Sequence, residues 1–264
     1  MPEAPVPTRP PAVRTITLHD PMWWLRRGWH DLTRCPLPGI VHGLATVAFG
    51  ALLLAIARDR FWLLAGAFTG FLLVAPIVAT GLYAVSRELG RGGRPSMATV
   101  LAVWRSQDVR LMSFGILLAC AGSGWVLTSA SLINAFAPAP INNPADFIRH
   151  VVLHPTSWLF ETWLVMGAAM AAPMFASTVV AVPLLLDRPI GVLDAVLTSW
   201  RAVMENPVPL ALWAALLMAL TAIGMATALL GLVVIVPWLA HASWHAYRDL
   251  IEPSGDMRRD DWRG

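Results

Sequence analysis

The stretch 207–227 reads PVPLALWAALLMALTAIGMAT and contains no charged residue, and the apolar stretch 229–247, LLGLVVIVPWLAHASWHAY, follows after one residue. A helix needs roughly 20 mainly apolar residues to cross the hydrocarbon core of a bilayer. Both stretches meet this length, so we predict two membrane spans. Because the connection between them is so short, the two spans should form a tight helical hairpin.

The same pattern recurs outward from this hairpin and predicts an all-α fold, a polytopic membrane helical bundle. Long runs without charge alternate with short segments that contain arginine. Six transmembrane helices are predicted, near 37–57, 61–86, 110–133, 156–186, 207–227 and 229–247. The fourth is long and contains Pro173 and Pro183, so we expect it to tilt, to kink or to extend beyond the bilayer.

The composition supports a membrane protein and argues against other classes. Of 264 residues, 57% are hydrophobic and 13% are charged, whereas a soluble domain has roughly a quarter charged residues. The net charge is only +3 and the basic residues form no continuous run, so we expect no nucleic-acid partner. Cys35 precedes the first span and Cys120 lies inside the third, so we expect neither a disulfide framework nor a cysteine metal site.

The arginines predict the orientation in the membrane. With the N-terminus inside, all but three of the 19 basic residues fall on the inner side, the exceptions being Arg58, Arg60 and Arg149. Because cytoplasmic loops carry an excess of arginine, we predict a multi-pass protein of the bacterial inner membrane with both termini cytoplasmic. The expected domains are a disordered cytoplasmic tail at 1–19, a six-helix membrane domain at 20–252 and a short polar cytoplasmic tail at 253–264.

An internal repeat organises the predicted spans into three hairpins. In each unit an amphipathic helix, expected to lie on the cytoplasmic face of the bilayer, precedes two spans. These helices are predicted at about 20–34, 95–106 and 189–205. In the first of them the polar side, opposite the apolar one, holds Arg26, Arg27, His30 and Asp31. The second span of each unit contains a proline, namely Pro76, Pro173 and Pro237. The prolines act either as hinges around a central site or as simple kinks that shape the bundle, and their frequency in membrane helices favours kinks.

Three segments resemble hallmarks of one bacterial family of integral membrane proteins, catalogued as domain of unknown function 2189. They are WHDL at 29–32, GFLLVAP at 70–76 with GLY at 81–83, and HASWHAYRDL at 241–250. The resemblance covers residues 20–252 and implies an inner-membrane protein without an established activity. Some members carry a cytochrome c oxidase subunit label. Haem–copper chemistry needs several histidines deep inside spans, and His42 is the single histidine expected inside a span.

Two histidines near the end of the sixth span are candidate functional positions. His241 and His245 are one helical turn apart, a spacing that suits one metal ion, but further ligands would be needed. The alternative is a hydrogen-bonded cluster at the membrane interface, with Arg248 facing the cytoplasm.

Glu161 and Tyr83 are the other polar candidates. Glu161 lies between Trp158 and Trp163 at the outer end of the fourth span. An acid inside a span is by default an ion or proton site, but this one can also reach the outer headgroups that the two tryptophans mark. Tyr83 belongs to the second segment that carries the family resemblance.

No motif in the chain predicts catalysis, so we expect neither enzyme activity nor a cofactor. The preferred hypothesis is a non-enzymatic membrane protein that binds lipid or partner proteins through its interfacial helices. The lipid bilayer and its anionic headgroups are the expected partners, and a homo-oligomer or a membrane-complex partner is a further prediction. The alternatives are a small transporter or channel, and an accessory subunit of a respiratory or redox membrane complex.

Overall fold

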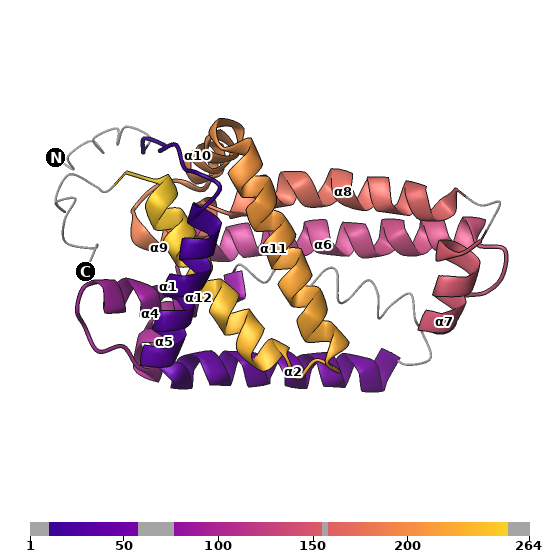
Figure 1. Ribbon diagram of the computed structural model, residues 1–264, viewed down its shortest axis with the longest axis horizontal. Coiled ribbons are helices and arrows are strands. Elements are labelled where there is room, and N and C mark those ends of the chain that lie inside the picture. The colour runs from indigo at the N-terminus through magenta and orange to yellow at the C-terminus, as the bar shows by residue number, and fades with distance from the viewer. Residues whose placement is uncertain (1–10, 58–76, 155–157, 253–264) are drawn as a thin grey trace.

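The computed structural model describes residues 11–57, 77–154 and 158–252, and most of these residues are helical (Figure 1). The elements are α1 (Asp20–Arg34), α2 (Pro36–Ala57), α4 (Thr80–Gly90), α5 (Met97–Arg105), α6 (Val109–Phe136), α7 (Pro144–Phe147), the π-helix η1 (Ile148–Val152), α8 (Leu159–Thr178), α9 (Ala181–Asp187), α10 (Val192–Glu205), α11 (Pro207–Ala226) and α12 (Leu232–Leu250). The described residues form no strand beyond an isolated β-bridge between Val13 and Ile251. The predicted all-α fold class is confirmed.

Within the described residues, four helical segments are long and apolar enough to cross a membrane. They are Pro36–Ala55, Val109–Phe136, Leu159–Asp187 and Pro207–Ala226. The apolar window of the last segment is only 22% buried, so most of its side chains face outward. Such a surface is stable in a bilayer, because exposed apolar side chains are solvated better by hydrocarbon than by water. The chain is an integral membrane protein with several apolar helices.

Two of the six predicted spans are not among these four segments. Most of the second, 61–86, lies outside the described residues, and only its end is seen at the start of α4. The sixth corresponds to α12, whose second half contains His241, His245 and Arg248. These polar residues lower the mean hydropathy of α12, so the number of six spans stays a prediction.

The long fourth segment is broken between α8 and α9. The break lies at Val179 and Val180, next to Pro183, whose ring clashes with the carbonyl four residues before it. At the break the amide of Val180 donates to Oγ of Ser199 in α10 over 3.1 Å. A buried side chain of a neighbouring helix thus supplies the acceptor that the interrupted helix lacks.

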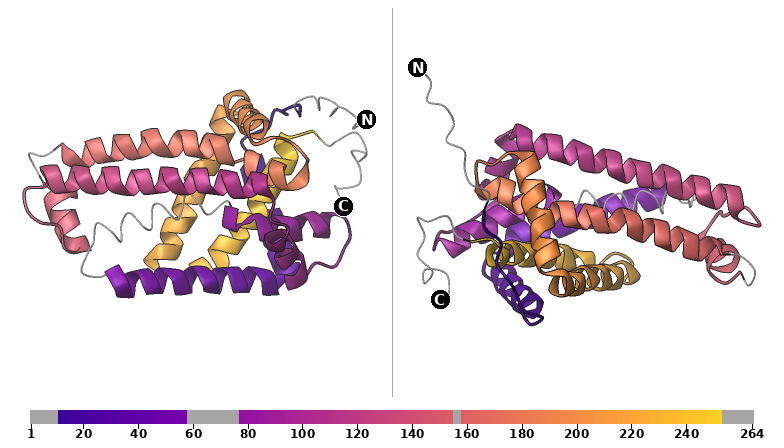
Figure 2. Two further views of the ribbon diagram at one scale, coloured as in Figure 1. Left: turned by 180° about the vertical axis from the view of Figure 1, so that it is seen from behind. Right: turned by 90° about the horizontal axis from the view of Figure 1, so that it is seen from above.

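The core lies at one end of the molecule. Helices α2, α6 and α8 run along the long axis, and α1, α4, α5, α9 and α10 gather near one end of it (Figures 1 and 2). There Trp24 of α1 meets Trp213 of α11 edge to face, with ring centroids 5.4 Å apart. A smaller cluster at the opposite end contains Ile133, Val151 and Leu159.

Residues 11–19 are ordered, which corrects the predicted disorder of the N-terminal tail for this part of it. The amide of Arg14 donates to the carbonyl of Leu250 over 2.8 Å. The side chain of Asn206, between α10 and α11, accepts from the amide of Ile16 over 2.8 Å. Only one of the prolines in the tail falls in this segment, so its backbone amides are free to pair, and both ends of the described chain are tied together.

Glycines allow α1 and α2 to approach α12 closely. A Cβ at Gly28 would lie 2.5 Å from the backbone nitrogen of Ala242, and one at Gly43 would lie 2.1 Å from the carbonyl oxygen of Val233. Gly39 and Gly43 have the four-residue spacing of small residues at close crossings of membrane helices. No larger residue fits at Gly28 or Gly43 unless the helices move apart.

Candidate functional site

Four polar side chains from three helices form a buried cluster near the end of the molecule where α1 lies. We name it the Asp31 cluster: Asp31 of α1, Ser86 of α4, and His241 and His245 of α12. Oγ of Ser86 donates to Oδ2 of Asp31 over 2.7 Å. The same oxygen lies 2.8 Å from Nε2 of His245. Nδ1 of His241 lies 2.8 Å from Oγ of Ser86.

The proton positions in the Asp31 cluster follow from its geometry. An ionised carboxylate only accepts hydrogen bonds, so the hydroxyl proton of Ser86 points to Asp31. Oγ of Ser86 then accepts from Nδ1–H of His241, which leaves this imidazole unable to take the serine proton. The cluster therefore does not activate Ser86 as a nucleophile. It joins α1, α4 and α12 through charge-assisted hydrogen bonds.

The pKa of Asp31 reflects two opposing effects. Burial acts to raise the pKa of this carboxyl, whereas the hydrogen bond and charge of His245 and the hydrogen bond from Ser86 act to lower it. The lowering effects prevail, and the pKa of Asp31 is held below its usual value. Asp31 is consequently ionised at neutral pH, the state in which it accepts both hydrogen bonds.

One ring nitrogen of each histidine is engaged, and the two have different partners. Nε2 of His245 contacts Asp31, and Nδ1 of His241 contacts Ser86. Among the residues that the structure describes, no group of three or more histidine, cysteine, aspartate or glutamate side chains could hold a metal ion. The geometry matches the hydrogen-bonded alternative for this pair, although the cluster lies inside the protein.

Two further carboxylates anchor the same part of α12. Oδ2 of Asp249 accepts from Nε1 of Trp24 over 2.8 Å, and Asp249 also forms an ion pair with Arg27. Oδ2 of Asp187, at the end of α9, lies 3.9 Å from Nη1 of Arg248. Arg248, predicted to face the cytoplasm, is therefore only partly exposed and is tied to α9.

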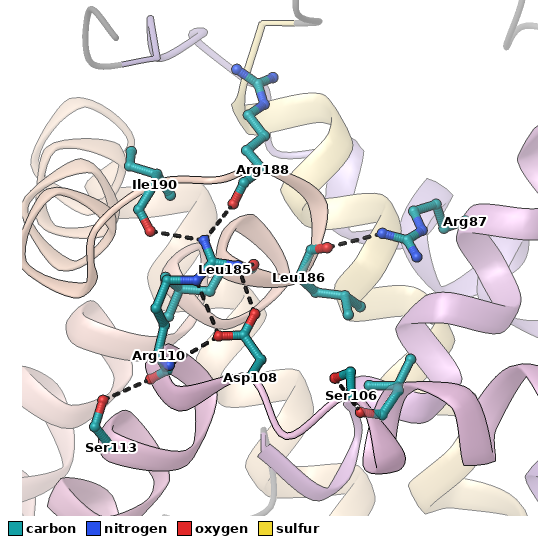
Figure 3. Close-up of polar contacts among 10 residues, drawn as sticks. Arg87, Ser106, Asp108, Arg110, Ser113, Leu185, Leu186, Arg188 and Ile190 are labelled. Carbon is teal, nitrogen blue, oxygen red and sulfur yellow. Dashed lines mark hydrogen bonds and ion pairs between the residues drawn. The ribbon is translucent and has the colours of Figure 1, made fainter. Parts of the chain in front are cut away.

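Two arginine side chains cap the C-terminal end of α9 by donating hydrogen bonds to its carbonyls (Figure 3). Arg110 donates to the carbonyl of Arg188 over 2.9 Å and to that of Leu185 over 3.2 Å. Arg87 donates to the carbonyl of Leu186 over 2.9 Å. The last carbonyls of a helix have no partner within it, and positive charge is favourable there. These arginines therefore stabilise the end of a short helix and are not free to bind a ligand.

Asp108 positions Arg110 for this role. Oδ1 of Asp108 accepts from the backbone amide of Arg110 over 2.9 Å and thereby caps α6. Nη2 of Arg110 lies 2.6 Å from Oδ2 of the same carboxylate. The hydrogen bonds from Arg110 hold the pKa of Asp108 below its usual value. The pair is a structural joint between α6 and α9.

His42 and Tyr83 have hydrogen-bond partners outside the Asp31 cluster. Nδ1–H of His42 donates to the carbonyl of Pro38 within α2 over 2.8 Å, and the ring lies 5.3 Å from that of Trp104. Tyr83 is buried on α4, beside Ser243 of α12. His42 is within electrostatic range of His241, but among the described residues neither His42 nor Tyr83 has a hydrogen bond to a member of the Asp31 cluster.

The remaining predicted positions are scattered over the molecule. Glu161 is exposed in the first turn of α8, at the end opposite the Asp31 cluster (Figure 1). A carboxylate is favourable at the N-terminus of a helix. Pro173 is exposed inside α8, whereas Pro237 is buried inside α12. These two prolines therefore line no common site, and Pro76 lies outside the described residues.

The amphipathic helices turn apolar side chains away from the protein. Helices α1 and α10 run at a steep angle to the long helices α6 and α8 (Figures 1 and 2). On α10, Leu193 is 70% exposed and Met204 is 65% exposed, whereas Thr198 and Ser199 are fully buried. A helix with this arrangement suits the membrane interface, because its outward apolar face can enter the bilayer. We call the exposed apolar residues of α1, α5 and α10 the interfacial surface: Met22, Trp23, Trp29, Trp104, Leu193, Leu197, Trp200 and Met204.

Three structurally central residues were not predicted from the sequence. The helical pattern places Asp31 on the polar side of α1 and predicts exposure, but the residue is buried with Ser86 and the histidines. Its one signal is its place in the WHDL segment, which carries the family resemblance. Ser86 and Asn206 belong to no pattern that marks them, because their partners are distant in the sequence.

The comparisons with known proteins agree with a membrane location. The model of a family described as "Predicted integral membrane protein (DUF2189)" matches residues 63–187. The resemblance predicted from the sequence is confirmed over this part of the chain. Searches of curated proteins and of solved structures gave no match.

Proposed function

We propose that this integral membrane protein, matched by the DUF2189 family over residues 63–187, binds anionic lipid headgroups at the inner leaflet of the bacterial inner membrane without catalysing a reaction. One observation carries the proposal. The interfacial surface is apolar, faces away from the protein and is accompanied by exposed arginines. An apolar face with flanking positive charge is the combination by which amphipathic helices bind anionic membranes.

Arginines near the interfacial surface fall into two groups. Those with partners inside the protein include Arg27, which pairs with Asp249, and Arg110, which binds carbonyls of α9. A second group is exposed and, in the described part of the chain, has no carboxylate partner. It consists of Arg26, Arg34, Arg91, Arg94 and Arg105. Each arginine near an anionic surface contributes about 1 kcal/mol of binding, so the second group can select anionic over zwitterionic lipid.

The connections to the long helices support a position at headgroup level. One residue, Cys35, separates α1 from α2, and one residue, Asn206, separates α10 from α11. The same arrangement thus occurs twice: an interfacial helix is followed directly by an apolar helix that begins with proline. This agrees with the proposed repeat of three hairpins and six spans. The arginine bias favours the cytoplasmic side for this end of the molecule.

The other hypotheses find less support in the geometry. A transporter of polar solutes needs a polar cavity near the middle of the membrane. The cavity between α2, α4, α11 and α12 has an uncharged and mainly apolar lining. No described group of side chains suits a metal centre, so a redox role has no supporting observation.

The test measures lipid binding by native mass spectrometry after reconstitution in equal amounts of phosphatidylglycerol and phosphatidylcholine. Replacing Arg26, Arg91, Arg94 and Arg105 by glutamine should lower bound phosphatidylglycerol at least about tenfold, since each charge contributes about 1 kcal/mol. Arg149→Gln is the matched control, because Arg149 is exposed on η1 at the opposite end of the molecule. Unchanged phosphatidylglycerol binding in the fourfold variant, with the protein still folded, would refute the proposal.

A further inference from the structure

A cavity of about 380 Å³ lies between α2, α4, α11 and α12. Its walls include Phe49 of α2, Tyr83 of α4, Met218 of α11 and Ser243 of α12. The volume falls in the range of pockets that hold small molecules, about 300–1,000 Å³. The cavity is separate from both the Asp31 cluster and the interfacial surface.

The chemistry of the described lining restricts the ligand to an uncharged one. No lining residue is charged. Most are aliphatic, aromatic or methionine, and methionine side chains adapt to flexible chains. A charged group placed in such a site would lose its hydration without gaining a partner.

The position of the cavity opening indicates that the ligand enters from the lipid bilayer. Two of its walls belong to α2 and α11, which are both apolar enough to cross a membrane. Phe49 is exposed and Met218 is 68% exposed on the rim of the cavity. Side chains exposed at this level of a membrane helix face hydrocarbon, so an alkyl chain could enter laterally.

Two of the hydroxyl groups in the lining, those of Thr46 and Ser243, can accept a hydrogen bond from a ligand. Thr46 donates its proton to the carbonyl of His42 over 2.9 Å, and Ser243 donates to the carbonyl of Leu239 over 2.8 Å. Each hydroxyl has one proton and further acceptor capacity. With the protons used within the helices, Thr46 offers acceptors to the cavity, and Ser243, whose oxygen also takes the hydrogen bond of Tyr83, offers its remaining acceptor site.

We infer that this cavity binds a neutral lipid chain that ends in a hydroxyl group. The chain occupies the apolar lining, and the ligand hydroxyl donates to Ser243 or Thr46. The inference does not depend on headgroup binding by the interfacial surface, because no residue of that surface lines the cavity.

The test uses dodecyl probes that carry a photoreactive diazirine and end in a hydroxyl, a carboxylate or a methyl group. The full-length protein is held in phosphatidylcholine nanodiscs and irradiated, and labelled peptides are mapped by mass spectrometry. The hydroxyl probe should label 46–53, 217–225 and 236–243 at least roughly tenfold more than the carboxylate probe. Labelling by the hydroxyl probe should exceed labelling by the methyl probe about two- to tenfold, which is the affinity ratio that one hydrogen bond provides. Equal labelling by the hydroxyl and carboxylate probes would overturn the inference.

Two sets of variants separate specific from general labelling. Ala222→Trp places an indole in the cavity and should lower hydroxyl-probe labelling at least about fivefold, whereas Ala215→Trp, on an exposed part of α11 outside the lining, should leave it unchanged. Wild-type labelling of a folded Ala222→Trp protein would refute the site. Should that variant fail to fold, the combined Thr46→Val and Ser243→Ala protein decides. Its hydroxyl-to-methyl labelling ratio should fall to about one, and an unchanged ratio would refute the role of the two hydroxyls.

Discussion

Gly43 is the position where one methyl group should have the clearest structural effect. Pro237 of α12 has no amide hydrogen, so the carbonyl of Val233, four residues earlier, lacks its helical donor. Gly43 of α2 packs directly against this carbonyl, and a Cβ there would lie 2.1 Å from its oxygen and 2.6 Å from its carbon. Such distances are far below contact distance and involve backbone atoms, so Gly43→Ala must push α2 and α12 apart.

The size of the effect follows from two opposing contributions. Overpacking of a close contact costs about 1–3 kcal/mol, while alanine gains about 0.5–1 kcal/mol over glycine inside a helix. The net loss for Gly43→Ala therefore lies between about 0 and 2.5 kcal/mol and is centred near about 1 kcal/mol. One kcal/mol corresponds to about 2–4 °C in Tm for a chain of this size, so Tm should fall by about 2–4 °C and by no more than about 10 °C.

Thermal unfolding in one detergent, followed by circular dichroism, measures this difference. Gly124→Ala is the matched control, since a Cβ at Gly124 in α6 would meet no atom within 4 Å. The control should keep or raise Tm, because it gains helix propensity without a clash. A Gly43→Ala protein that unfolds at or above the wild-type temperature would show that the α2–α12 crossing is not held by this contact.

Three further predictions concern the polar contacts. Asp31→Asn should lower Tm at pH 7 and should make Tm fall less steeply between about pH 5 and pH 3. The pKa of Asp31 is lower in the folded protein than its value of about 3.9 in the unfolded chain, so ionised Asp31 stabilises the fold above that value and the stabilisation is lost as the pH falls through the folded-state pKa. An unchanged dependence of Tm on acid pH would contradict this. Asn206→Ala should release the N-terminal segment, seen as at least about tenfold faster trypsin cleavage after Arg14, since opening free energy sets the rate. Arg110→Gln should lower the free energy of unfolding by about 1–3 kcal/mol by leaving carbonyls at the end of α9 unpaired, whereas Arg105→Gln, which is exposed, should change it by less than about 0.5 kcal/mol.

The helices were largely predictable, whereas their exposure was not. Helix α1 begins and ends at the predicted residues 20 and 34, because helical periodicity is a local property of the sequence. The apolar pattern of 189–205 also predicts a helix with one apolar face. Periodicity alone does not decide whether that face packs on protein or on lipid. In α10 the apolar face is outside, and Thr198 and Ser199 are inside.

The predicted candidate residues were located with mixed success. His241 and His245 do belong to a buried polar cluster, yet the residue at its centre, Asp31, was expected on an exposed face. Burial of a carboxylate is tolerated only where donors from other helices meet it. Those donors come from positions up to 214 residues away, a separation at which sequence spacing carries no geometric information.

The sequence by itself determined that this chain is a helical membrane protein, because a run of about 20 apolar residues prefers hydrocarbon to water whatever surrounds it. The tertiary structure decided which side chains meet. It brought Asp31, Ser86 and His241 together, placed Gly43 against the carbonyl of Val233 and left a cavity between α2 and α11. The physical reason is that hydropathy sums over neighbours in the chain, whereas hydrogen bonds and close packing depend on how the helices cross.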